Sequence, residues 1–117
     1  MTGNDVFERV LNLLGYINSY NAKVDKESLL NRAPQIINQI CLDLKIPQIN
    51  RLSDEIDANA SAQEALCYGV AMLLALIEGD GDNNKVFADI YNAKRMTALS
   101  SKTVIEDKLP TVSYGVD

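Results

Sequence analysis

Apolar residues recur every three or four positions in four segments of the chain, which is the spacing of an amphipathic helix. The predicted helices span residues 5–17, 25–44, 61–78 and 84–100. Between the second and third helices, residues 46–59 contain a proline and many Asn, Asp and Ser residues, which indicates a connector. The pattern predicts an all-α fold: a small bundle of four main helices with a central apolar helix and an extended C-terminal tail.

The third segment contains the least polar run of the chain, Ala65 to Ile77. A helix without a polar stripe is buried by several neighbours. Its 13 residues are fewer than the roughly 20 that a membrane span requires, so we expect a core helix. Ser61 and Glu64 are spaced as a capping box at its start. Gly69 disfavours a helix by about 1 kcal/mol relative to Ala. It is either a tolerated defect or a point where another helix approaches closely, and we predict the close approach.

Polar residues and glycine at the segment ends predict where the helices begin and end. Asp5 and Asp25 are placed as N-caps of the first two helices, and Asp82 or Asn83 as the cap of the fourth. Gly79 fits the left-handed position that ends the third helix.

Two features inside the helices carry further expectations. Pro34 predicts a kink or a break in the second helix, and the apolar face continues in phase across it, which favours the kink. The expected apolar face of the fourth helix consists of Val86, Phe87, Ile90, Tyr91 and Leu99. Lys94 and Arg95 lie in its expected last turns, where positive charge suits the helix dipole.

Residues 102–117 have no helical period and contain proline, glycine and β-prone residues. We therefore divide the chain into a helical domain, residues 1–101, and an extended or flexible tail, residues 102–117. The short apolar groups of the tail are spaced as docking points for an extended peptide. They are Val104, Ile105, Val112 and Tyr114. An ordinary frayed terminus is the alternative.

Composition narrows the function classes. The 117 residues allow one domain, with a net charge of −5 and a pI near 4.6. An acidic chain lacks the basic face that nonspecific binding to nucleic acid needs. The chain has no His, which removes the commonest general base and metal ligand. No spacing singles out an acid/base pair either, so we expect neither an enzyme nor a small-molecule substrate.

Cys41 and Cys67 lie in apolar helical segments, and we expect buried free thiols. The first residues show neither the basic nor the apolar region of a signal peptide, so synthesis in the cytoplasm is expected.

Two acidic stretches could be taken for metal sites. Residues 54–57 are expected to be a solvated surface. Residues 80–84 alternate as at the start of a calcium loop, but Lys85 stands where such a loop requires glycine and Tyr91 where it requires glutamate. We therefore expect no metal and no cofactor.

Several motifs together resemble the small head–tail connector proteins, also called adaptor or head-completion proteins, of tailed bacteriophages and prophages. In that family an apolar helix with a Tyr-Gly step leads into an acidic turn and a last helix with aromatic and basic residues. The matching segments here are CYGVAMLL (67–74), GDGDNN (79–84), Phe87 and YNAKR (91–95). The helical segment LLNRAPQIINQICLDL (29–44) is similar too, so the resemblance covers most of the chain. Its interface candidates are Tyr68, Gly69, Tyr91, Lys94 and Arg95.

The resemblance implies a structural role in virion assembly. Connector subunits form a homo-oligomeric ring beneath the portal protein, extend the DNA channel and offer a platform for a tail or stopper protein. DNA would pass without specific binding, and the protein would move from the host cytoplasm into the virion. A cytosolic helical protein-interaction or regulatory module without a virion role is the alternative that the residues leave open.

Overall fold

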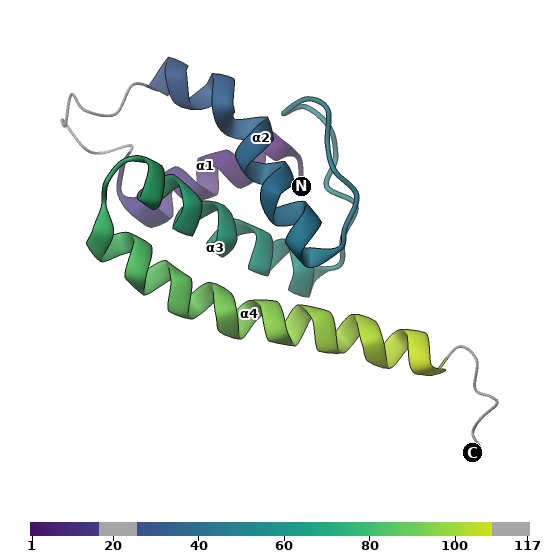
Figure 1. Ribbon diagram of the computed structural model, residues 1–117. Coiled ribbons are helices and arrows are strands. Elements are labelled where there is room, and N and C mark those ends of the chain that lie inside the picture. Colours follow the sequence, from purple (N-terminus) through teal and green to yellow (C-terminus); the bar gives the residue numbers. More distant parts are fainter. Residues whose placement is uncertain (17–25, 109–117) are drawn as a thin grey trace.

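The computed structural model describes the backbone of residues 1–16 and 26–108, and the side chains of residues 1–16 and 30–100. This part of the chain forms four helices: α1 (Gly3–Leu14), α2 (Lys26–Leu44), α3 (Ala60–Ile77) and α4 (Gly81–Lys108). No strand occurs within these described residues, although an isolated bridge pairs Thr2 with Glu55. The prediction of an all-α bundle of four main helices is confirmed (Figure 1).

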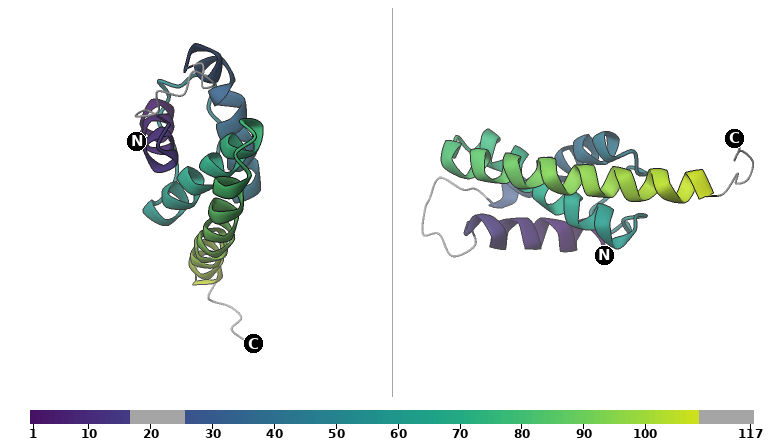
Figure 2. Two further views of the ribbon diagram at one scale, coloured as in Figure 1. Left: turned by 90° about the vertical axis from the view of Figure 1, so that its left-hand side faces the viewer. Right: turned by 90° about the horizontal axis from the view of Figure 1, so that it is seen from below.

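The apolar helix α3 lies at the centre and packs against α1, α2 and α4. It forms a hairpin with α4, while α1 lies on another side of it (Figures 1 and 2). By length and composition α3 could cross a membrane, with a mean hydropathy of 1.5 over 18 residues, but 50% of that stretch is buried inside the fold. Its contacts with three neighbouring helices favour the predicted core helix over a membrane span.

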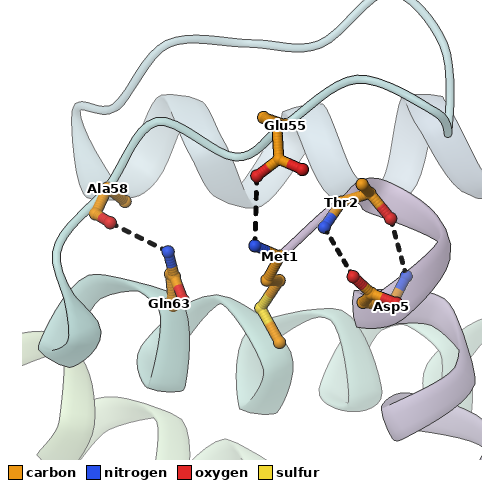
Figure 3. Close-up of polar contacts among 6 residues, drawn as sticks. All are labelled: Met1, Thr2, Asp5, Glu55, Ala58 and Gln63. Carbon is orange, nitrogen blue, oxygen red and sulfur yellow. Dashed lines mark hydrogen bonds and ion pairs between the residues drawn. The ribbon is translucent and has the colours of Figure 1, made fainter.

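The start of α1 is capped by Thr2. The Thr2 hydroxyl accepts a hydrogen bond from the Asp5 amide at 3.2 Å, and the Asp5 carboxylate accepts one from the Thr2 amide at 2.9 Å (Figure 3). The two residues form a capping box, so the prediction of Asp5 as the N-cap is wrong. Gly15 ends the helix with a φ of 77°, in the left-handed region. The helix therefore ends at Leu14, and the prediction that it extends to residue 17 is wrong.

The connector between α2 and α3 is attached to both α1 and α2. Backbone hydrogen bonds join Ile56 to Met1 at 2.8 Å and Asn4 to the Leu52 carbonyl at 2.8 Å. The Asn38 side chain on α2 bonds both the amide and the carbonyl of Ile49, at 2.8 and 2.7 Å. Ile49 and Ile56 are buried, so two apolar anchors and a line of hydrogen bonds hold the connector against the bundle.

α2 continues through Pro34 as one helix, which excludes the predicted break. Figure 1 shows its axis changing direction partway along, as expected for a kink at an internal proline. α2 begins at Lys26, and its predicted cap, Asp25, lies outside the described residues.

The capping box predicted for α3 is wrong. Asn59 is the N-cap, and its side chain accepts from the Ala62 amide at 2.8 Å. Glu64 is therefore available for other contacts. At the other end the prediction is confirmed: Gly79 has a φ of 73°, and its amide donates to the Leu76 carbonyl.

α4 differs most from its prediction. Asp80 caps it by accepting from the Asn83 amide at 3.3 Å, so neither Asp82 nor Asn83 is the N-cap. The helix continues to Lys108 instead of ending near residue 100. Residues 102–108, which were assigned to an extended tail, are thus helical, and residues 109–117 lie outside the described residues. Val86 is also corrected, since it is 53% exposed and does not belong to the buried face.

Gly69 lies where three helices meet. A Cβ atom placed on it would come within 2.7 Å of Ile40 Cγ2 on α2 and 2.7 Å of Tyr91 Cε1 on α4. Contacts under 3.0 Å are essentially never seen for real Cβ atoms. The predicted close approach is confirmed, and it occurs within the subunit.

We expect Gly69→Ala to lower the free energy of unfolding by about 1 kcal/mol, because overpacking costs about 1–3 kcal/mol and the gain in helix propensity is about 1 kcal/mol. Chemical denaturation followed by circular dichroism measures this change. Gly81→Ala is the matched control, since nothing lies within 4 Å of its added Cβ atom. Equal or higher stability of Gly69→Ala would show that the close packing tolerates a methyl group.

Candidate functional site

The first cluster of polar side chains joins α1, α3 and α4 around Tyr68. Glu64 accepts from Arg9 Nη2 at 3.0 Å and from Lys94 Nζ at 3.3 Å. The same two cations flank the Tyr68 ring, with Arg9 Cζ 5.9 Å and Lys94 Nζ 5.6 Å from its centroid. Cations at this distance from an aromatic face are attracted to it. One carboxylate and one ring therefore bind both cations.

Apolar side chains extend this cluster along α3 and α4. The Phe87 ring lies 5.9 Å from the Tyr68 ring and is buried. Met72 follows Tyr68 by one helical turn, and Ile90 lies on α4 between Phe87 and Lys94; both are half-buried. We call the accessible part of this region the Tyr68 surface, which consists of Arg9, Glu64, Tyr68, Met72, Ile90 and Lys94.

The charges of the Tyr68 surface stabilise one another. The hydrogen bond from Arg9, together with Lys94, holds the pKa of Glu64 below its ordinary value. The bond to Glu64 in turn raises the pKa of Arg9. About a third of each of these side chains is accessible to solvent, so we expect each ion pair to add little stability.

The second cluster lies on another side of α4 and joins it to α2. Asp43 accepts from the Tyr91 hydroxyl at 2.5 Å and from Arg95 Nε at 2.7 Å. The sequence neighbours of this pair, Leu42 and Met96, are 61% and 68% exposed. We call Leu42, Asp43, Arg95 and Met96 the Asp43 surface; it combines an ion pair with two exposed apolar side chains. Arg and Met are among the residue types enriched at protein interfaces.

Burial and hydrogen bonding act in opposite directions on Asp43. Desolvation alone would raise the pKa of Asp43, but the hydrogen bonds from Tyr91 and Arg95 outweigh it, and the pKa is lowered. Burial and the bond to Asp43 raise the pKa of Tyr91, so the phenol stays protonated and donates. These two hydrogen bonds to Asp43 connect α4 to α2.

The structure separates the predicted interface candidates. It places Tyr68 and Lys94 on the Tyr68 surface, and Arg95 on the Asp43 surface. Tyr91 is only 4% exposed, and Gly69 is buried, so both pack mainly inside the subunit.

Lys94 and Arg95 lie in the middle of α4, so the predicted interaction with the dipole at the helix end is wrong; they pair with carboxylates of other helices. Val104 and Ile105 belong to α4, and their side chains lie outside the described set, as do Val112 and Tyr114.

Three charged residues of the two surfaces were missed from the sequence. Arg9 and Asp43 were given no role, and Glu64 was placed in a capping box. A charged residue on a helix flank gives no sign of its partner when the partner is thirty or more residues away, as in the pairs of Arg9, Asp43 and Lys94.

Reactive groups elsewhere are few among the described residues. Both cysteines are free and buried, and burial raises the pKa of the Cys41 thiol to about 11, which disfavours the reactive thiolate. No group of three His, Cys, Asp or Glu residues in the described part could hold a metal ion. A hollow of about 180 Å³ lies between the end of α2, the connector and α4; its lining includes Leu44, Pro47, Ala62 and Ala98.

We expect Tyr91→Phe to lower the free energy of unfolding by about 1.5 kcal/mol, the low end for a hydrogen bond to a charged group, because water can reach Asp43. Denaturant titration gives the value. Tyr68→Phe is the control, since the Tyr68 hydroxyl has no hydrogen-bond partner among the described residues. Equal effects of the two changes would contradict a stabilising hydrogen bond between the Tyr91 hydroxyl and Asp43.

We expect the effect of Glu64→Gln to depend on pH. The folded-state pKa of Glu64 is lowered, so its contribution is complete above the ordinary pKa of about 4.3 and is lost as the pH falls through the folded value. The difference in Tm between the wild type and Glu64→Gln should be constant from about pH 7 to 5 and shrink at lower pH. Glu8→Gln, at an exposed position of α1, is the control. A difference that persists in acid would mean that Glu64 acts through packing instead of charge.

Comparison of the chain with protein-family models, with curated proteins and with solved structures found no match.

Proposed function

We propose that the chain is a structural subunit of a tailed bacteriophage or prophage that forms a ring at the head–tail junction. The ring would lie beneath the portal protein, extend the DNA channel and receive a tail or stopper protein. The resemblance of residues 67–95 to connector proteins is the reason for proposing this position in the virion. The structural observation that supports ring formation is that two different surfaces lie on two sides of α4.

A ring requires two surfaces that differ, because each subunit contacts its neighbours head to tail. Here Lys94 takes part in the Tyr68 surface, while the next residue, Arg95, takes part in the Asp43 surface. The two surfaces have different composition, since one has two cations around an aromatic ring and the other has two exposed apolar side chains. A surface that pairs with itself would need only one of them.

The distribution of exposed apolar side chains also supports association. Large apolar residues that are at least 44% exposed occur on α2, α3 and α4. They are Leu42, Leu76, Ile77, Val86 and Met96. Single exposed residues of this kind are common on monomers, but Leu76 and Ile77 are adjacent at the end of the core helix. Contacts with neighbouring subunits would cover them.

The charge of the chain suits the proposed channel. With a net charge of −5, the protein repels phosphate overall. DNA would then move through a ring of such subunits without being retained by nonspecific contacts.

The test is electron microscopy of the purified protein, alone and mixed with the portal protein encoded by the same genome. We expect rings in at least the mixture. Met96→Asp should reduce ring formation without lowering Tm, because the Met96 side chain is 68% exposed and is not part of the hydrophobic core. Thr97→Asp, at the next exposed position, is a matched control for the added charge.

Absence of rings in both samples would contradict the proposal. A discrete dimer bound to an unrelated cytosolic protein would favour the alternative, a helical interaction module. A gene for a portal or capsid protein beside the gene for this chain would support the virion role independently of the microscopy.

A further inference from the structure

We infer that the C-terminal segment of one copy, residues 109–117, binds the Tyr68 surface of a neighbouring copy. This inference deepens the proposed function and rests on it, because it names the contact that would join adjacent subunits. The observations that carry it are the position where α4 ends, the length of chain beyond it, and the chemistry of the two parts.

The end of α4 is far from its own Tyr68 surface. Among the side chains of α4 that the structure describes, which end at residue 100, Ala98 is the last buried one, and the helix continues to Lys108. Figure 1 shows this end of α4 projecting past the other helices. Lys94 is the member of the Tyr68 surface nearest to that end, yet fourteen residues of helix, about 21 Å, separate the two.

The segment is too short to cover that surface in its own chain. Val112 follows Lys108 by four residues, which extend over about 14 Å at most. Tyr114 follows by six residues and reaches about 21 Å only when fully extended. Val112 and Tyr114 therefore cannot pack on Ile90 of the same copy, because Ile90 lies one helical turn beyond Lys94, and Val116 would reach it only with the whole segment fully extended. A second copy has no such restriction.

The segment and the surface are chemically matched. Val112, Tyr114 and Val116 alternate with small or polar residues, so an extended chain places the three on one side. The half-buried apolar side chains of Tyr68, Met72 and Ile90 offer partners for them. The nine residues of α3 from Glu64 to Met72 span about 12 Å along the helix axis, close to the length of an extended chain from Val112 to Val116.

The charges of the surface and of the segment predict which end of the segment lies at which end of the Tyr68 surface. The Tyr68 surface carries Arg9 and Lys94 against the single carboxylate of Glu64, hence one net positive charge on a chain whose total is −5. The only charged side chain of residues 109–117 is Asp117. It would lie at the Arg9–Lys94 end of the surface, with the valines and the tyrosine toward Met72.

Cross-linking between full-length chains tests the inference. One chain carries Met72→Cys and a second, of different mass through a tag, carries Ser113→Cys; the native thiols are buried. We expect a short bis-maleimide to give a product of the two chains, in a yield at least tenfold above that of Met96→Cys with Ser113→Cys. Met96 is the control because it is more exposed but lies on the Asp43 surface. Lys94→Glu, added to the Met72→Cys chain, should lower the yield several-fold.

Equal yields at positions 72 and 96 would overturn the inference. So would a cross-link within one chain that carries both Met72→Cys and Ser113→Cys, measured at a dilution where copies are separate. Circular dichroism confirms that each variant folds, and Ile90→Cys replaces Met72→Cys if that variant does not. Rings in the microscope without the cross-link would refute this contact alone, whereas the cross-link without rings would refute the ring and leave the contact intact.

Discussion

The contact at Gly69 is the constraint on which the rest of the bundle depends. Because Gly69 has no side chain, Ile40 of α2 and the Tyr91 ring of α4 can both lie 2.7 Å from the position that a Cβ atom would occupy. In a close-packed interior, a change in the position of one side chain shifts the side chains that pack against it. Tyr91 is buried at this point and still directs its hydroxyl to Asp43, so the polar tie between α2 and α4 follows from the packing.

Polar residues then decide how the outer helices are held on α3. Arg9 brings a cation from α1, Lys94 brings another from α4, and Glu64 accepts from both. Tyr16 at the end of α1 donates to Asp80, which also caps α4. Each of these contacts is partly exposed and individually weak. Together they connect α1 with α3 and with the start of α4.

The same arrangement leaves α4 with three kinds of surface. One side is buried against α3 through Phe87, Tyr91 and Ala98. Two flanks carry the Tyr68 and Asp43 surfaces, and the C-terminal part of α4 extends past the start of α3 (Figure 1). Because α4 has 28 residues and α3 has 18, the end of α4 projects from the bundle (Figure 1), so Lys108 lies far from the Tyr68 surface of its own copy. This distance is the physical basis for the proposed contact between copies.

The sequence by itself determined the elements that depend on local pattern. The 3.6-residue period located all four helices, the unbroken apolar run marked α3 as the core, and Gly79 marked its end because a left-handed residue is required there. The sequence also indicated a close approach at Gly69. These features depend on residues within a few turns of one another, so they are visible along the chain.

Only the tertiary structure decided which polar groups pair. Asp5, Ser61 and Asp82 all have the right type for a cap, but Thr2, Asn59 and Asp80 occupy the capping positions, since each cap depends on how the preceding loop is held. The length of α4 was misjudged because its last turns lack an apolar period. Glu64, Arg9 and Asp43 could not be assigned to surfaces, because their partners lie 30 to 55 residues away and meet only when the helices pack.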